Sequence, residues 1–121
     1  MKILIVDDSR AMRLIVRRSL RQAGFDVEGV TEATNGAEAL AAIRVDSPDL
    51  VLSDWNMPEM TGIELLAALT AEGKKIPFVF ITSENTPEMR ERALSSGARG
   101  MIAKPFDEDK LREVLGPILR G

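Results

Sequence analysis

The sequence contains no cysteine and no histidine among its 121 residues. Without cysteine, the chain has no disulfides, no thiolate nucleophile and no zinc site built from thiolates. Without histidine, it has no imidazole base or metal ligand, cannot carry a phosphohistidine, and cannot form a triad of the Ser-His-Asp type. Thiol catalysis, triad hydrolysis and zinc-thiolate sites are therefore excluded.

Aromatic residues are also scarce, and positive charges do not outnumber negative ones. Aromatic residues make up 4% of the chain, with no tyrosine, which is a poor supply of stacking platforms for single-stranded nucleic acid. The net charge of −3 lacks the basic excess typical of proteins that coat nucleic acid.

Long hydrophobic runs are missing as well. The N-terminal apolar run, residues 3–6, is too short for a signal sequence, and no run approaches the length of a membrane span. Apolar residues at 45% and charged residues at 29% are typical of a soluble globular protein. We therefore expect a cytoplasmic protein, with residues 1–121 forming a single domain.

What the chain does contain is an alternation of short apolar runs with segments of helical periodicity. The runs cover residues 3–6, 27–33, 50–52, 76–81 and 101–103, and the second is weak and interrupted. Glycines 24, 73 and 97 follow periodic segments, while Thr61 with Glu64, Thr86 before Pro87, and Asp107 are helix-start signals. Pro117 is discordant, because proline is expected to kink or end the last helix.

This alternation predicts an α/β fold with a doubly wound, five-stranded parallel sheet. The near-continuous apolar strands favour a sheet covered by helices on both faces. The weak second strand suits the edge position that it has in the flavodoxin-like order 2-1-3-4-5.

Polar side chains follow four of the predicted strands. They are Asp7 and Asp8 after the first strand, Asp54 after the third, Thr82 and Ser83 after the fourth, and Lys104 after the fifth. Taken singly, each is more often a turn, cap or surface residue. In a parallel sheet, however, all of them lie on one rim, where ligands bind in open α/β folds.

The three carboxylates on this rim need a cation, since two like charges about 4 Å apart repel by roughly 4 kcal/mol at an effective dielectric of 20. Oxygen ligands with few other donors suit Mg²⁺. Lys104 adds a fixed positive charge, and Thr82 and Ser83 add hydroxyl donors. The ensemble is suited to placing a phosphoryl group on or beside a carboxylate.

Four segments resemble the motifs of the response-regulator receiver family, in order and over the whole chain. They are Val6 to Ser9, Asp54 to Gly62, Ile81 to Ser83 and Lys104 to Phe106. The Asp-Trp-Asn-Met-Pro run is most similar to the stand-alone chemotaxis, CheY-like, type.

The resemblance implies a phosphorylation-dependent signalling switch of two-component systems rather than an enzyme acting on other molecules. It makes Asp54 the phosphoacceptor, with Mg²⁺ held by Asp7, Asp8, Asp54 and the backbone carbonyl of Asn56. It assigns Thr82 and Lys104 to the phosphoryl oxygens. The donor would be a phosphohistidine on a sensor kinase or phosphotransfer protein, and an unidentified partner would receive the output.

The resemblance also implies the switch and tuning positions. Ser83 and Met101 belong to the switch, and signals would leave through the face formed by the fourth helix, fifth strand and fifth helix. Met101 departs from the aromatic residue often found at its position in the family. Glu84 and Asn56 would tune the phosphoryl lifetime, and Pro105 would follow a cis peptide.

Three alternatives remain open: a receiver fragment of a longer DNA-binding regulator, a phosphorelay intermediate, and an Mg²⁺-dependent phosphatase that works through an aspartyl phosphate. Such a phosphatase would need a second carboxylate, acting as acid and base, two residues after the nucleophile, and Asn56 occupies that position here.

The first predicted helix is crowded with arginines at positions 10, 13, 17, 18 and 21. This pattern fits three alternatives. The helix face is solvated, binds a membrane surface or nucleic acid, or docks the acidic surface of a donor protein.

Overall fold

Strands and helices alternate regularly along residues 1–120, which are the residues that the computed structural model describes. The strands are β1 (Ile3–Val6), β2 (Val30–Ala33), β3 (Leu50–Ser53), β4 (Phe78–Thr82) and β5 (Gly100–Ala103). The helices are α1 (Arg10–Gln22), α2 (Gly36–Val45), α3 (Gly62–Ala71), α4 (Pro87–Ser95) and α5 (Glu108–Arg120).

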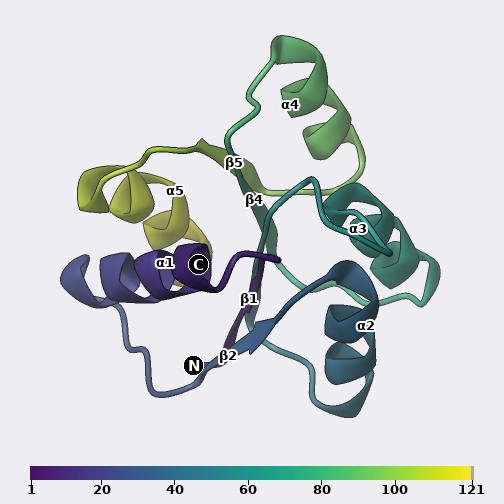
Figure 1. The fold of residues 1–121 in the computed structure, drawn as a ribbon, viewed down its shortest axis with the longest axis horizontal. Helices are drawn as coiled ribbons and strands as arrows, with labels where there is room; N and C mark the ends of the chain where they lie inside the picture. Colours follow the sequence, from purple (N-terminus) through teal and green to yellow (C-terminus); the bar gives the residue numbers. More distant parts are fainter. Residues whose placement is uncertain (121) are drawn as a thin grey trace.

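The strands form one parallel sheet in the order β2-β1-β3-β4-β5, which confirms the predicted fold class and strand order. Helices α1 and α5 cover one face of the sheet, and α2, α3 and α4 cover the other (Figure 1). Side chains alternate between two buried clusters: Ile3 and Ile5 pack with α1 and α5, whereas Leu4 and Val6 belong to the cluster on the opposite face.

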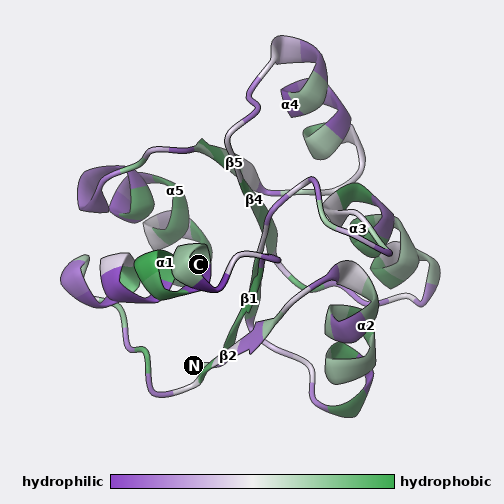
Figure 2. Ribbon diagram, in the orientation of Figure 1, coloured by the Kyte–Doolittle hydropathy of each residue, from purple (hydrophilic) through white to green (hydrophobic). Residues whose placement is uncertain are grey.

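The sheet's hydropathy explains why β2 is the weak strand. Figure 2 shows hydrophobic residues along β1 and β4 but hydrophilic residues in β2. All residues of β1 are buried, whereas Thr31 and Glu32 in the middle of β2 are exposed. An edge strand is covered less than a central one, so it needs fewer apolar residues.

Several predicted boundaries need correction. β2 begins at Val30 rather than at residue 27, because the Val30 N–H donates to the Val27 carbonyl in a turn (3.2 Å). β4 begins after Pro77 and runs through Thr82, so Thr82 is the last strand residue rather than a loop residue. Helix α5 does not end at Pro117 but continues to Arg120, so this proline lies inside the helix although it lacks the N–H that a helical hydrogen bond needs.

The predicted helix-start signals are confirmed. Thr61 and Glu64 form a reciprocal capping box on α3, Thr86 accepts from the Met89 N–H on α4, and Asp107 accepts from the Lys110 N–H. Gly24, Gly73 and Gly97, which follow α1, α3 and α4, have positive φ angles, the conformation that glycine adopts most easily at helix ends. These local signals fix where each helix starts and stops, and hence which loops reach the site.

Candidate functional site

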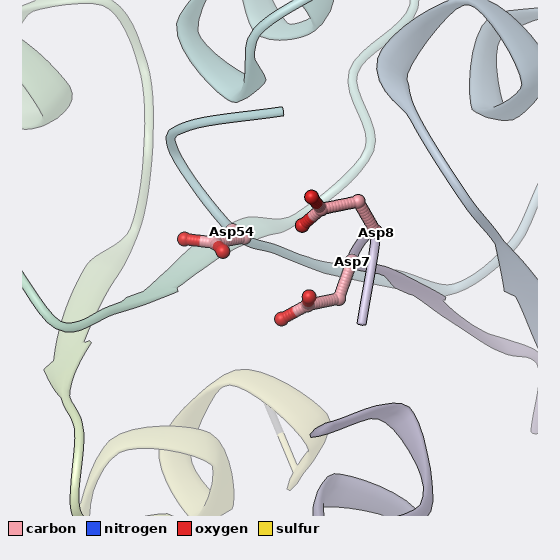
Figure 3. Close-up of side chains that lie close together, drawn as sticks. All are labelled: Asp7, Asp8 and Asp54. Atoms are coloured by element: carbon pink, nitrogen blue, oxygen red, sulfur yellow. The ribbon is translucent and has the colours of Figure 1, made fainter. Parts of the chain in front are cut away.

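Three carboxylates meet where β1 and β3 end side by side. Asp7 and Asp8 follow β1, and Asp54 follows β3; one carboxylate oxygen from each lies within 4.8 Å of the others (Figure 3). The backbone enforces this approach, because the Asp54 N–H donates to the Val6 carbonyl at 2.9 Å. The predicted cluster is therefore present in the structure.

The carboxylates of buried Asp7 and partly buried Asp54 accept hydrogen bonds from nearby backbone N–H groups. Asp7 is only 4% exposed, and its Oδ1 accepts from the Ser9 N–H at 2.9 Å. Asp54 Oδ1 accepts from the Trp55 N–H at 2.7 Å. Asp8 is exposed, and its side chain completes the cluster on the solvent side.

Lys104 supplies the positive charge that the sequence predicts beside the carboxylates. Its Nζ lies 3.1 Å from Asp7 Oδ2 and 3.3 Å from Asp54 Oδ2, and its side chain is 15% exposed. The ammonium group therefore bridges the ends of β1 and β3 from β5, across the width of two strands. One ammonium cannot balance three carboxylates, so the cluster keeps a net negative charge.

The pKa of Asp54 is raised above its ordinary value. Burial is the main cause, since it disfavours the charged carboxylate, and the neighbouring charge of Asp7 acts in the same direction. Lys104 and the Trp55 N–H act in the opposite direction and offset part of this effect. The site therefore disfavours the ionised form of Asp54, and a bound cation would stabilise that form.

The cluster fits the oxygen donor set of a hard divalent cation. Three carboxylates on rigid strand ends, with no competing nitrogen or sulfur ligand among them, suit Mg²⁺, which binds through a few carboxylates and keeps several waters.

The loop after β4 brings two further predicted residues together. Asn56 Nδ2 donates to Glu84 Oε1 at 2.6 Å, so a side chain from the loop after β3 is tied to one from the loop after β4. Thr82 is buried at 1% exposure, and its Oγ1 accepts from the Glu84 N–H at 3.2 Å. Ser83 is exposed between them.

Met101 and Pro105 lie on and after β5. Met101 is 2% exposed and packs in the same cluster as Trp55, Phe78 and Phe80. Its backbone carbonyl accepts from Arg90 of α4 at 3.3 Å. The peptide between Lys104 and Pro105 is cis, as the resemblance implies.

The structure also shows contacts that the sequence analysis missed. Arg13 of α1 donates to the Asp7 backbone carbonyl, and the Arg92 guanidinium lies 5.9 Å from the centre of the Trp55 ring. Gly62 begins α3 so close to Asp54 that a Cβ atom there would lie 2.2 Å from the Asp54 carbonyl oxygen. A sequence signal existed for Arg13, because long side chains on a helix point back toward its N-terminus, here the Asp7–Ser9 turn.

Within residues 1–120, no helix has both the length and the apolar character needed to cross a membrane. Of the five arginines of α1, Arg13 and Arg17 lie near Glu32 of β2, with the Arg13 Nε 2.7 Å and the Arg17 Nη1 3.8 Å from its carboxylate. This part of the arginine cluster is therefore engaged within the fold.

Comparisons with known proteins agree with this geometry. The family model described as the response regulator receiver domain matches residues 3–116. The chemotaxis protein CheY-3 of Vibrio cholerae is 43% identical over 120 residues, covering 98% of this chain and 91% of the relative. CheY of Pseudomonas aeruginosa is 39% identical over 120 residues, covering 98% and 95%.

Solved structures show the same fold. The chemotaxis protein CheY4 of Vibrio cholerae superposes with a TM-score of 0.83 at 36% identity, covering 97% of both chains. The receiver domain of the Francisella response regulator 1452 gives a TM-score of 0.87 at 28% identity, covering 98% of this chain and 96% of that one. The chain therefore belongs to the response regulator receiver family.

Proposed function

We propose that this receiver domain is a phosphorylation-dependent switch of two-component signalling, in which Asp54 accepts a phosphoryl group from a phosphohistidine of a partner protein. One observation carries the proposal: Asp54, directly after β3, lies 3.3 Å from the Lys104 ammonium and clusters with the carboxylates of Asp7 and Asp8. The chain has no histidine and cannot be its own donor.

In the proposed transfer, a carboxylate oxygen of Asp54 forms a bond to phosphorus while the bond from phosphorus to the donor's imidazole nitrogen breaks. Lys104 neutralises charge on the phosphoryl oxygens, and Thr82 donates its hydroxyl to one of them. Asp7, Asp8, Asp54 and the Asn56 backbone carbonyl would hold Mg²⁺, which when bound supplies further charge neutralisation at these oxygens. Hydrolysis then returns the carboxylate and releases phosphate.

The Asn56–Glu84 pair borders the same rim, and we assign it the role of tuning how long the phosphoryl group persists. The hydrogen bond of 2.6 Å between the two side chains supports this assignment, because it ties the loop that begins at Asp54 to the loop that follows β4. We expect self-dephosphorylation to be faster than in receivers that control transcription.

The output is proposed to leave through α4, β5 and α5. When Thr82 turns toward the phosphoryl group, the Ser83–Pro87 loop and the β5 strand around Met101 would shift with it. Met101 is unbranched and fills either arrangement at low cost, so it would be a softer reporter than an aromatic ring. The bond from Arg90 to the Met101 carbonyl supports a mechanical link between α4 and β5.

We also propose that residues 1–121 act as one receiver domain whose only chemistry is its own phosphorylation and dephosphorylation, with a sensor kinase or phosphotransfer protein as donor. A receiver fragment of a longer DNA-binding regulator and a phosphorelay intermediate share this chemistry and differ in their partners. The phosphatase alternative lacks support, because Asn56 stands where its acid would be, and the Asn56 amide is bonded to Glu84.

Incubation with acetyl phosphate, followed by intact-mass spectrometry, tests the proposal. We expect a single phosphate adduct that requires Mg²⁺ and disappears in Asp54→Asn. An adduct that survives in Asp54→Asn, or that forms equally well in EDTA, would contradict it. Sustained turnover of p-nitrophenyl phosphate would favour the phosphatase instead.

Amide NMR with and without beryllofluoride tests the output face. We expect shifts in the segments around Glu84 to Arg90 and around Met101. Changes confined to Asp7, Asp8 and Asp54 would rule out this face.

A further inference from the structure

Arg13 of α1 bonds to the backbone of Asp7, one of the three residues of the carboxylate cluster. Its Nη1 donates to the Asp7 backbone carbonyl at 2.6 Å, and its Nε donates to Glu32 Oε1 at 2.7 Å. The side chain is 12% exposed, which is unusual for a residue type that is normally solvated. A planar guanidinium that bonds two different partners has its orientation fixed by both.

The contacted carbonyl belongs to the peptide that joins Asp7 to Asp8. Asp7 is fixed by several other bonds: its N–H donates to the Ala33 carbonyl at 3.1 Å, Oδ1 accepts from Ser9, and Oδ2 accepts from Lys104. Asp8 is exposed, and fixing the plane of the peptide before it restricts the directions that its carboxylate can take. The guanidinium holds that plane.

Charge alone would make Arg13 unhelpful here, because a positive group beside the cluster competes with any cation that binds there. Glu32 compensates for this charge by pairing with Arg13, while Arg17 lies farther from Glu32, at 3.8 Å. The arrangement therefore keeps the directional hydrogen bond to Asp7 while neutralising most of the charge.

We infer that Arg13, anchored by Glu32, is a positioning residue for the metal site: it clamps the Asp7–Asp8 peptide so that the Asp8 carboxylate faces Asp54. The inference rests on the proposed function in that the carboxylate cluster binds Mg²⁺. Groups that orient metal ligands typically change metal affinity by about 10- to 100-fold when removed.

The test is calorimetric titration of Mg²⁺ into the full chain and into Arg13→Gln, Arg13→Lys and the control Arg17→Gln. Positioning predicts that both Arg13 variants bind Mg²⁺ about tenfold more weakly. Arg17→Gln removes the same charge one helical turn away, with no bond to Asp7, and should bind within about twofold of the parent. A role through charge alone predicts the opposite: tighter binding in Arg13→Gln and unchanged binding in Arg13→Lys.

Repeating the titrations in about 1 M KCl, where the screening length falls to about 3 Å, removes most of the charge effect and should leave the tenfold loss. Equal or tighter binding in Arg13→Gln under these conditions would overturn the inference. Circular dichroism tests whether each variant is folded. If Arg13→Gln is not, Arg13→Lys and Glu32→Gln, which loosens the anchor at an exposed position of β2, give the same comparison.

A metal-free readout separates this inference from the proposed function. Amide hydrogen exchange at Asp8 and Ser9 in EDTA should be faster in Arg13→Gln than in the parent and unchanged in Arg17→Gln. Unchanged exchange at both amides would defeat the clamp, whatever the metal result. If the parent chain fails to bind Mg²⁺ while the exchange still responds, the proposed metal site is wrong and the clamp stands.

Discussion

Replacing Asp54 with asparagine is expected to stabilise the protein in the absence of a divalent cation. The substitution keeps the side-chain shape and the oxygen that accepts from the Trp55 N–H, but removes a negative charge that the fold holds beside two others. The raised pKa of Asp54 has the same meaning, because the native state disfavours the ionised carboxylate relative to the unfolded chain.

The structure sets the size of the effect. At an effective dielectric of 20, a carboxylate oxygen 4.8 Å from Asp54 repels it by about 3.5 kcal/mol, and the Lys104 ammonium at 3.3 Å attracts it by about 5 kcal/mol. Asp7 and Asp8 both repel Asp54, and Asp8 repels it less because Asp8 is exposed. The attraction to Lys104 nearly cancels these two repulsions. What remains is the cost of removing the Asp54 carboxylate from water. We expect Asp54→Asn to raise the free energy of unfolding by about 1–3 kcal/mol at pH 7.

Thermal unfolding in EDTA, followed by circular dichroism, measures this effect. An unfolding entropy of about 2.1 cal/mol/K per residue converts the gain into a midpoint rise of about 4–12 °C for a chain of 121 residues. The matched control is Asp109→Asn, an exposed aspartate in the first turn of α5 that pairs with Arg112, which should lower stability by up to about 1 kcal/mol and never raise it.

The pH dependence has a definite sign. Since the folded pKa of Asp54 is raised, the native state retains the proton longer than the unfolded chain, and stability falls as pH rises from 3.8 through the folded pKa. The advantage of Asp54→Asn should therefore be full at neutral pH and vanish below about pH 4. An equal or lower midpoint for Asp54→Asn in EDTA at pH 7 would refute the electrostatic account of the site.

Three further substitutions test the surroundings of Asp54. Lys104→Met should lower the free energy of unfolding, measured by urea titration in EDTA, by about 1–3 kcal/mol. This is less than the loss expected for a fully buried ion pair, and added Mg²⁺ should make the loss smaller. Gly62→Ala should cost about 1–3 kcal/mol in the same assay, because its Cβ would meet the Asp54 carbonyl oxygen at 2.2 Å and neither backbone can yield cheaply. Arg92→Ala should cost about 0.5–1 kcal/mol and shift the Trp55 emission spectrum, since it removes the guanidinium that lies 5.9 Å from the ring; an unchanged spectrum would count against that contact.

The order of the elements along the chain was accessible from the sequence because its causes are local, whereas the strand order was inferred from the weak second strand and the known flavodoxin-like arrangement. Apolar runs, helix caps and glycines mark where each element starts and stops, and Thr61 with Glu64 forms the capping box that its spacing predicts. The edge strand was less accessible. Only the two ends of β2 are buried, so its apolar signal is short and merges with the turn at Val27.

Which residues form the carboxylate rim could also be predicted from the sequence. Parallel strands end on the same side of the sheet, so the residues that directly follow them lie on one edge. The partners of these residues could not be predicted in the same way. The Asn56–Glu84 contact joins two loops whose residues are 28 positions apart, and no periodicity encodes it. The bond from Arg13 to the Asp7 carbonyl joins residues only six positions apart, and its one signal is the tendency of long helix side chains to point back toward the helix N-terminus. The roles of the site residues rest on family resemblance and stay predictions.

The backbone hydrogen bonds of the sheet bring the carboxylates close together and fix their positions. Asp7 is placed by its N–H bond to Ala33 of β2, and Asp54 by its N–H bond to Val6 of β1, so the sheet that buries the core also forces the charges into proximity. The fold therefore holds Asp54 in a site that disfavours its ionised form, mainly because the carboxylate is removed from water. A change of charge at Asp54, whether by a cation or by the proposed phosphoryl group, must then alter the stability of the loops that leave β1, β3 and β4. Under the proposed function, that coupling would turn a local charge at Asp54 into a change elsewhere on the surface, because only states that differ in their interaction with the charge can be shifted by it.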